Sequence, residues 1–376
     1  MDVVGTIAAF VAILVVLVLV HELGHFVTAK MAGITVEEFG IGFPPRITSM
    51  MFRGTRYSLN WIPLGGFVRM LGEDGDVEIR RLRESGLDDD EIQQAMTGAF
   101  NRKPIWVRIG VLLAGVVMNF LLAIVLFAWA TALPQPYSAG PLEVLSIQPE
   151  SPAEDVLQPG DIIVAADGRT YERSLDLTAY VADRGGEEVT LTIERDGEEI
   201  DITVEPRVLS PEDVAAGIGA VGFGWQATRI GQDPPIASSP VDALRIGAAQ
   251  TAEVAVQIPA GLARAVGGLV GLNPDGADDA RGPIGIAQVT GEVVDAGLVA
   301  IVQFIGLLSV NLAVLNVLPF PPLDGGRIAV VLIEAVRRRR MPAEREAFIY
   351  LAGFAVLIAL VIMISIKDIQ RLISGG

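Results

Sequence analysis

Long apolar runs alternate with polar stretches along the chain, and this pattern predicts the helices first. Four runs are apolar enough to cross a membrane, which takes about 20 residues in helical form. The first has no basic residue before it and no small-residue cleavage site after it, so we expect a retained span and no signal peptide. The four predicted transmembrane segments are 1–29, 105–133, 298–326 and 348–376. The third range includes a Leu-Asp-Gly-Gly loop at its end, and the fourth includes the C-terminus.

The segments between these runs carry different patterns. In 30–104, the stretch RYSLNWIPLGGFVRM alternates apolar and polar residues, which predicts a small hairpin or sheet. Segment 141–208 predicts a compact β-rich domain, with a hairpin turn at Asp196-Gly197. Segment 209–297 is predicted to be an amphipathic helical connector, and 327–347 a basic loop.

Composition and charge narrow the class of protein. Hydrophobic residues make up 51% of the 376 positions, and the net charge is −17. Residues 134–297 hold nine Lys and Arg against 27 Asp and Glu, which argues against a nucleic-acid partner. Because cations favour the cytosolic side, we expect 30–104 and 327–347 to be cytosolic, and the acidic block and both termini to be extracytoplasmic. The absence of cysteine excludes disulfides and thiolate catalysis.

Candidate chemistry begins at the end of the first apolar run, in the sequence HELGH. On a helix, His21 and His25 share a face and can bind one metal ion, and Glu22 lies beside them, placed to accept a proton from water. The chain contains no other histidine. Ionisable residues at membrane depth are costly and mostly functional, so we predict a metal site and not a structural histidine pair.

A catalytic zinc site normally has three protein ligands, and two histidines leave it incomplete. With no further His or Cys, the third ligand must be a carboxylate. Asp324, in the Pro- and Gly-rich break NVLPFPPLDGG, is the candidate inside an apolar stretch. Pro-Pro-Leu-Asp-Gly-Gly is also good turn chemistry, but the incomplete metal site favours Asp324 as a ligand.

Three asparagines lie within the predicted spans. Asn311 and Asn316 in the third span could join helices or contact substrate, and the sequence leaves both interpretations open. Asn119 in the second span is also a candidate substrate contact, but helix packing is favoured there, because Ala114 and Gly115 allow close helix approach.

Several of these motifs resemble known families. Residues 151–168 resemble a PDZ domain of the bacterial protease-associated type. HELGH, AGVVMN and NVLPFPPLDGG resemble the site-2 protease family of intramembrane zinc metalloproteases. SVNLAVLN, IPLGGFVRM, AFNRKPIWVR and RGPIGIA narrow the resemblance to the bacterial branch typified by the regulator of sigma-E protease.

The resemblance implies a polytopic α-helical membrane protein. It would have four transmembrane helices, a membrane-associated cytosolic β-loop and one extracytoplasmic PDZ domain. It implies one Zn²⁺ per chain on His21, His25 and Asp324, with Glu22 as general base. It also implies that the loop carrying Gly65 and Gly66 holds the substrate strand. Further implied substrate contacts are Asn311 and Asn316.

The expected activity is cleavage of single-span membrane proteins in the bacterial inner membrane, after an earlier cut. Anti-sigma factors and signal-peptide remnants are examples. Pro319 and Pro321 would break the third span and leave it open to an extended substrate, and the PDZ groove would take a peptide or a chain end. The enterobacterial member carries two PDZ domains where one is visible here. The alternatives are a membrane-tethered PDZ adaptor and a metal transporter.

Overall fold

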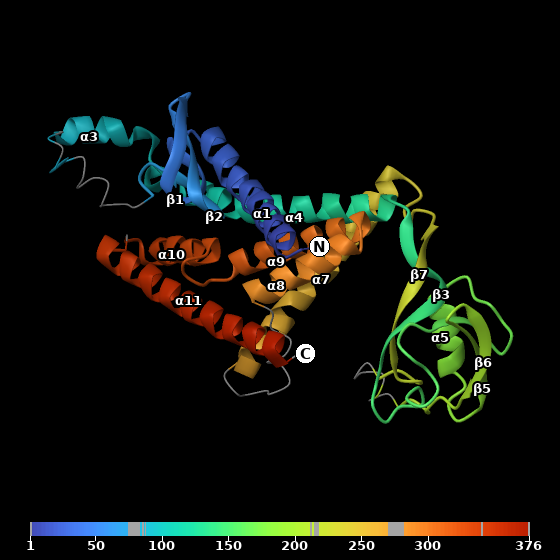
Figure 1. Cartoon of the computed structure of the whole chain (residues 1–376). Coiled ribbons are helices and arrows are strands. Elements are labelled where there is room, and N and C mark those ends of the chain that lie inside the picture. The colour runs from blue at the N-terminus through green and yellow to red at the C-terminus, as the bar shows by residue number, and fades with distance from the viewer. Residues whose placement is uncertain are drawn as a thin grey trace. The chain divides into compact units, whose positions relative to one another are not determined.

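The structure is a computed structural model, and it describes residues 2–73, 83–84, 86, 88–210, 213, 218–269, 282–339 and 341–374. The chain forms two compact units (Figure 1). Met1–Ala132 and Ala237–Gly376 make up the first, which holds the long helices and a small sheet. Leu133–Ile236 make up the second, which holds a larger sheet and helix α5.

Apolar helices dominate the first unit. Within the described residues, four helical segments are long and apolar enough to cross a membrane: α1, α4, α9 and residues Glu344–Arg371 of α11. At about 1.5 Å per residue, even the 20 residues of α9 span the roughly 30 Å of a bilayer core. The prediction of a polytopic helical membrane protein that also contains β-sheets is therefore confirmed. The helices are α1 (Val3–Met31), α3 (Asp89–Ala95), α4 (Ile105–Ala132), α7 (Pro240–Leu269), α8 (Pro283–Asp295), α9 (Leu298–Val317), α10 (Asp324–Arg337) and α11 (Ala343–Ser374), with 3₁₀ turns at Met96–Gly98 and Phe100–Arg102.

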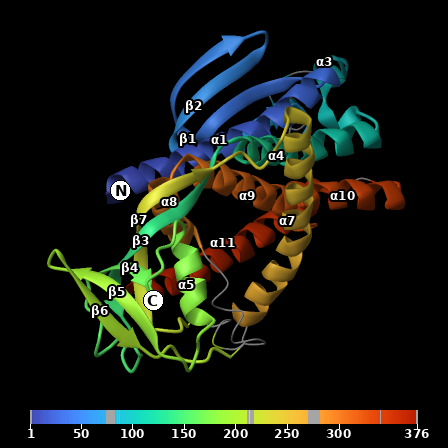
Figure 2. The same ribbon diagram turned by 90° about the vertical axis from the view of Figure 1, so that its right-hand side faces the viewer.

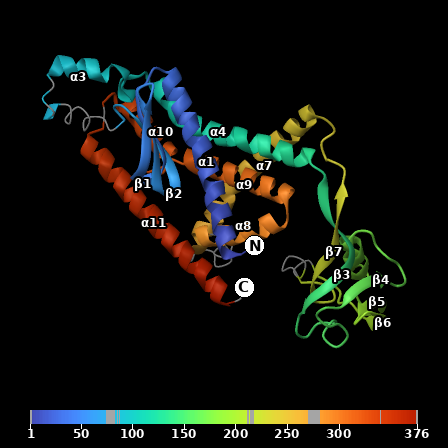
Figure 3. The same ribbon diagram turned by 45° about the horizontal axis from the view of Figure 1, so that its top comes forward.

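Helix α4 packs against three long helices, α1, α7 and α9 (Figure 3). Glycines bring the backbones together at two of these contacts. A Cβ on Gly24 of α1 would overlap the Ala114 carbonyl of α4, and a Cβ on Gly247 of α7 would lie 2.5 Å from the Ile124 carbonyl oxygen. Helix α1 is therefore held against α4 close to its histidines.

Helix α8 begins at the RGPIG motif and is tied to the end of α11. The buried carboxylate of Asp368 accepts hydrogen bonds from the backbone N–H groups of Gly282 (3.2 Å) and Gly285 (2.8 Å). It thereby satisfies donors that the first turn of a helix leaves free. Helix α8 also contacts α1 and α9, so it links α11 to the rest of the unit.

The small sheet consists of β1 (Val36–Phe52) and β2 (Thr55–Met70), which pair antiparallel, and β2 packs on α1 (Figure 3). Both strands bend, so β1 residues 38–41 pair on one side with residues 56–59 and on the other with residues 66–69. Within the described residues no further strand joins this sheet, so the outer edge of segment 66–70 has no strand partner.

A loop follows the third span at residues 318–323, but the prediction that it continues from Asp324 onward is wrong. Asp324 is the first residue of α10, which continues to Arg337 through the predicted basic loop. Gly325 and Gly326 make the bend before it tight, because a Cβ on either would overlap the backbone of residues 317–321. The Pro- and Gly-rich sequence is typical of a turn, and for this reason the helical repeat of apolar residues directly after it was not recognised.

The second unit is a five-stranded antiparallel sheet of order β6-β5-β4-β3-β7, with α5 lying against one face (Figure 2). Its core is formed by residues such as Leu142, Ile163, Leu177, Leu191 and Ile193. The elements are β3 (Gln135–Ile147), β4 (Ile162–Ala166), α5 (Ser174–Ala182), β5 (Val189–Arg195), β6 (Glu198–Val204) and β7 (Phe223–Asp233).

This sheet extends beyond the range predicted for the compact domain, 141–208. It begins at Gln135, and β7 lies in the segment 209–297 that was predicted to be helical, so that prediction is wrong for β7. Strand β7 pairs with β3, about 80 residues earlier in the chain, which no local pattern can reveal. Helices α7 and α8 do occupy the later part of the predicted connector, and its residues 270–281 lie outside the described ones.

Candidate metal centre and active site

Three side chains from distant parts of the sequence meet in the first unit. His21 and His25 lie one turn apart on α1, with their Nε2 atoms 3.2 Å apart. Asp324 Oδ2, at the start of α10, lies 2.9 Å from His21 Nε2 and 3.2 Å from His25 Nε2. The two histidines are buried, and the Asp324 side chain is 17% exposed. One ligand atom from each residue therefore faces a common point.

The other ring nitrogens hold the imidazoles in place. His25 Nδ1 lies 2.8 Å from the Val111 carbonyl oxygen and donates to it, so in the neutral imidazole Nε2 carries no proton and can bind a metal. Asn119 Nδ2 lies 3.3 Å from His21 Nδ1, while the buried Asn119 Oδ1 has no hydrogen-bond partner among the described residues. If the amide of Asn119 is turned over, so that its oxygen and nitrogen change places, Oδ1 accepts a hydrogen bond from the Nδ1 proton of His21. Nε2 of His21 then carries no proton either and can bind a metal.

These donor atoms fit a zinc ion. For ligand bonds of about 2.0–2.1 Å, the corners of a tetrahedron lie roughly 3.3 Å apart, close to the three separations in this cluster. Gly115 of α4 keeps the space beside them open, because a Cβ there would lie 2.5 Å from His25 Nε2 and 2.8 Å from His21 Nε2. Two imidazoles and a carboxylate are also an ordinary donor set for catalytic zinc.

Glu22 lines the same cavity as His25 and Asp324. The cavity has a volume of about 520 Å³, and residues 66–70, the β2 segment with the free outer edge, form one wall. A Cβ on Gly66 would lie 3.1 Å from Glu22 Cγ, so the strand backbone passes close to this carboxylate. The cavity therefore lies beside the candidate metal centre. It also contains Glu22, a carboxylate that can accept or donate a proton, and the strand edge that has no strand partner among the described residues.

The predicted substrate contacts do not all lie at the cavity. Gly66 lines the cavity, and Gly65 lies under the ring of Phe43, which lines it too. Asn119 is fully buried, and its side-chain contact in the structure is with His21, a candidate ligand.

The remaining predicted contacts lie on or after α9. Asn316 is buried, and its Nδ2 donates to the Leu312 carbonyl of its own helix, 3.0 Å away. Asn311 is half-buried and Pro319 exposed. Pro321 lies against Gly353 of α11, and the neighbouring Pro322 lines the cavity.

The sequence did not predict an ion pair in the cavity wall, which Glu73 and Arg327 form. Arg327 follows Asp324 by three residues, a spacing that places both on one helix face. That spacing was the available signal, but the predicted loop concealed it.

A comparison with protein-family models decides the class of protein. The model of peptidase family M50 matches residues 9–360. The chain belongs to peptidase family M50. The predicted resemblance to the site-2 proteases is confirmed, and so is the predicted class of enzyme: the chain is an intramembrane zinc metalloprotease.

Curated relatives of this M50 peptidase match over nearly their whole length. The zinc metalloprotease RasP of Bacillus licheniformis is 30% identical and the match covers 98% of this chain and 99% of the relative. The regulator of sigma-W protease RasP of Bacillus subtilis matches at the same identity and coverage. A putative zinc metalloprotease of Mesorhizobium japonicum is 33% identical over 94% of this chain and 95% of the relative. The apolar helices and these relatives indicate a protein of the inner membrane.

Solved structures match over about a quarter of the chain. The PDZ domain of an SdrC-like protein from Listeria monocytogenes is 21% identical, with a TM-score of 0.20, over 24% of this chain and 88% of that one. The corresponding PDZ domain from Listeria innocua is 20% identical, also with a TM-score of 0.20, over 24% of this chain and 94% of that one.

Proposed function

We propose that His21, His25 and Asp324 hold the catalytic zinc and that Glu22 is the general base. The convergence of three ligand atoms beside a cavity lined by Glu22 supports this assignment. When bound, zinc supplies a Lewis acid that polarises the scissile carbonyl and makes water a stronger nucleophile at neutral pH. Glu22 takes the proton from the attacking water and delivers it to the leaving amine.

The substrate is held as an added strand on the free edge of residues 66–70. Backbone groups on that edge can pair with an extended peptide, and the edge faces the cavity that Glu22 also lines. A peptide bond within a helix is shielded by the helix's own hydrogen bonds, so pairing with this strand requires the substrate to unwind. Gly66 lets the extended segment pass close to Glu22, and Pro322 lines the same space.

The substrates are single-span membrane proteins already shortened by another protease. Anti-sigma factors fit this description, and the name of the Bacillus subtilis relative refers to sigma-factor regulation. The cation distribution supports a cytosolic position for the β1–β2 sheet and α10, with both termini and residues 133–236 outside. The second unit acts as a PDZ domain, and its apolar groove of about 450 Å³, beside α5, takes a peptide or a chain end.

The test is cleavage of a single-span substrate in liposomes by the wild type and by Glu22→Gln. Glu22→Gln keeps the size of the side chain but cannot accept the proton, so we expect zinc content to be unchanged and cleavage to fall by at least about 100-fold. Asp324→Ala should lose both zinc and cleavage. Equal cleavage by Glu22→Gln and wild type would refute the mechanism. Zinc flux across the liposomes would favour a transporter, and function that depends on residues 133–236 but not on Glu22 would favour an adaptor.

A further inference from the structure

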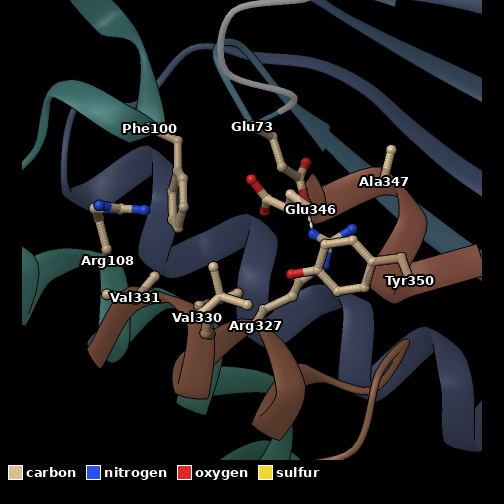
Figure 4. Close-up of a pocket in the computed structure, with 10 residues that line it drawn as sticks. Glu73, Phe100, Arg108, Arg327, Val330, Val331, Glu346, Ala347 and Tyr350 are labelled. Atoms are coloured by element: carbon tan, nitrogen blue, oxygen red, sulfur yellow. Dashed lines mark ion pairs between the residues drawn. The ribbon is translucent and has the colours of Figure 1, made fainter. Parts of the chain in front are cut away.

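A second cavity, of about 290 Å³ (Figure 4), shares lining residues with the 520 Å³ cavity beside the candidate metal centre. Its walls come from the loop after β2, the start of α4, α10 and α11. Glu73, Leu112 and Arg327 line both cavities. In Figure 4, Glu73 descends from the β2 side and Arg327 rises from α10, and the dashed line marks their ion pair. The pair therefore stands in the wall that the two cavities share.

Glu73 holds the end of the edge strand. One of its carboxylate oxygens accepts a hydrogen bond from the backbone N–H of Met70, the last residue of β2, at 3.2 Å. The Glu73 N–H in turn donates to the Met70 carbonyl at 3.1 Å. The other carboxylate oxygen binds Arg327 Nη1, so the two oxygens have separate partners. The Glu73 side chain is 15% exposed, and an unpaired carboxylate in this place would be costly.

Arg327 connects this strand end to the candidate metal ligands. It lies one turn after Asp324 on α10, and its guanidinium lies 5.9 Å from the centre of the Tyr350 ring on α11, within the range of a cation–π contact. Asp324 is itself fixed by its contacts with both histidines. A short series of contacts therefore joins Met70 through Glu73 and Arg327 to the helix that carries Asp324.

The edge strand is thus held at two points. Gly66 packs against Glu22 at one end, and Met70 is held by the Arg327–Glu73 pair at the other. The distance between these points is about 13 Å for extended backbone, roughly the length of four residues. Any peptide added to this edge takes its position along the cavity from these two attachments.

We propose that Arg327 and Glu73 are a positioning pair that sets the register of the substrate strand relative to the metal ligands. The proposal rests on strand addition at residues 66–70, as in the proposed function. Neither side chain performs a chemical step: Arg327 acts through Glu73 on the strand, and its loss lets the Met70 end of the strand move. Lysine at position 327 would keep the charge but lose the planar guanidinium and its contact with Tyr350.

The test measures zinc content, KM, kcat and the cleaved bond for Arg327→Met, Arg327→Lys and Glu73→Gln, using a reconstituted single-span substrate. Arg337→Met is the matched control, because Arg337 is an exposed arginine near the other end of the same helix. We expect Arg327→Met to keep full zinc, to lose about 10- to 100-fold in kcat/KM, mainly through KM, and to cut at neighbouring bonds as well. Arg327→Lys should be intermediate, and the control should match the wild type.

A double variant tests whether the two residues act as a unit. If they do, Glu73→Gln combined with Arg327→Met should lose no more activity than Arg327→Met alone. Additive losses would overturn the proposal, and so would a loss of zinc in Arg327→Met, or a KM and cleavage site equal to those of Arg337→Met. These outcomes are separate from failure of the proposed function, which would appear as undiminished cleavage by Glu22→Gln.

Discussion

Replacing Gly115 by alanine should remove zinc from the enzyme without unfolding it. The added Cβ would lie 2.5 Å from His25 Nε2, about 0.9 Å short of the 3.4 Å at which ordinary contact begins, and 2.8 Å from His21 Nε2. Both atoms are candidate zinc-binding nitrogens. The methyl group and the ligand atoms therefore compete for the same space, and one of them must move.

The surrounding contacts decide which group moves. Helix α4 cannot simply withdraw from α1, because it is packed on its other sides by α7 and α9, and Gly24 already touches the Ala114 backbone. The histidine side chains are the softer partners. A displacement of about 1 Å in a catalytic group typically costs on the order of 100-fold in rate, and overpacking costs about 1–3 kcal/mol of stability.

Gly110→Ala is the matched control, since Gly110 lies on the same helix and a Cβ there would meet nothing within 4 Å. It should keep its zinc and gain about 0.5–1 kcal/mol from the better helix propensity of alanine. The assay is zinc content after dialysis against a competing chelator, followed by substrate cleavage. If Gly115→Ala retained zinc and cleaved at the rate of Gly110→Ala, the assignment of His21 and His25 as ligands beside Gly115 would be refuted.

Three further outcomes are expected. Asn119→Ala should weaken zinc binding by about 10- to 100-fold in a chelator competition, because it removes the side chain that orients His21. Chelation should abolish cleavage and added zinc should restore it, whereas recovery without metal would contradict the site. In the second unit, burial opposes ionisation of Asp161, but its hydrogen bonds from Arg195 and from the Gln158 N–H outweigh burial and hold the pKa of the carboxyl below its usual range. The ion pair therefore stabilises the sheet fully above the unfolded pKa near 3.9 and is lost as pH falls through the lower folded value. Asp161→Asn should lower the opening free energy of β4 and β5 at pH 7 by about 1.5–3 kcal/mol, the range for hydrogen bonds to a charged group, and hydrogen exchange measures this change. The variant should also lack the loss of stability at acidic pH, and protection equal to that of the wild type would contradict this.

The sequence was most informative where a feature depends on local spacing. His21 and His25 share a helix face because of a four-residue interval, and the long apolar runs coincide with α1, α4, α9 and α11. Asp324 came from elimination, since a chain without cysteine or a third histidine must complete a zinc site with a carboxylate. Asp324 was therefore identified from the residue types that can bind zinc, and not from any spacing along the chain.

Contacts between segments that are distant in the sequence could not be predicted from local patterns. Arg327 and Glu73 are 254 positions apart, and neither residue type is unusual in its local sequence. Asn119 was recognised as an intramembrane polar residue, but the sequence could not show that its partner is His21 and not a substrate. Strand β7 was predicted as part of a helical connector because the strand it pairs with, β3, lies before the rest of the domain.

The first turn of α10 explains why a second helix, and not a continuation of α9, supplies the carboxylate. Gly325 and Gly326 allow the chain to fold back tightly over residues 317–321, so α10 starts at Asp324 in a new direction. Asp324 then lies at the N-terminal end of α10, beside the Nε2 atoms of both histidines. The same turn carries Arg327, which reaches the end of β2 through Glu73. A change in the backbone of this turn therefore affects both the metal site and the substrate strand. A substitution of Arg327 alone should affect the substrate strand and leave zinc binding unchanged.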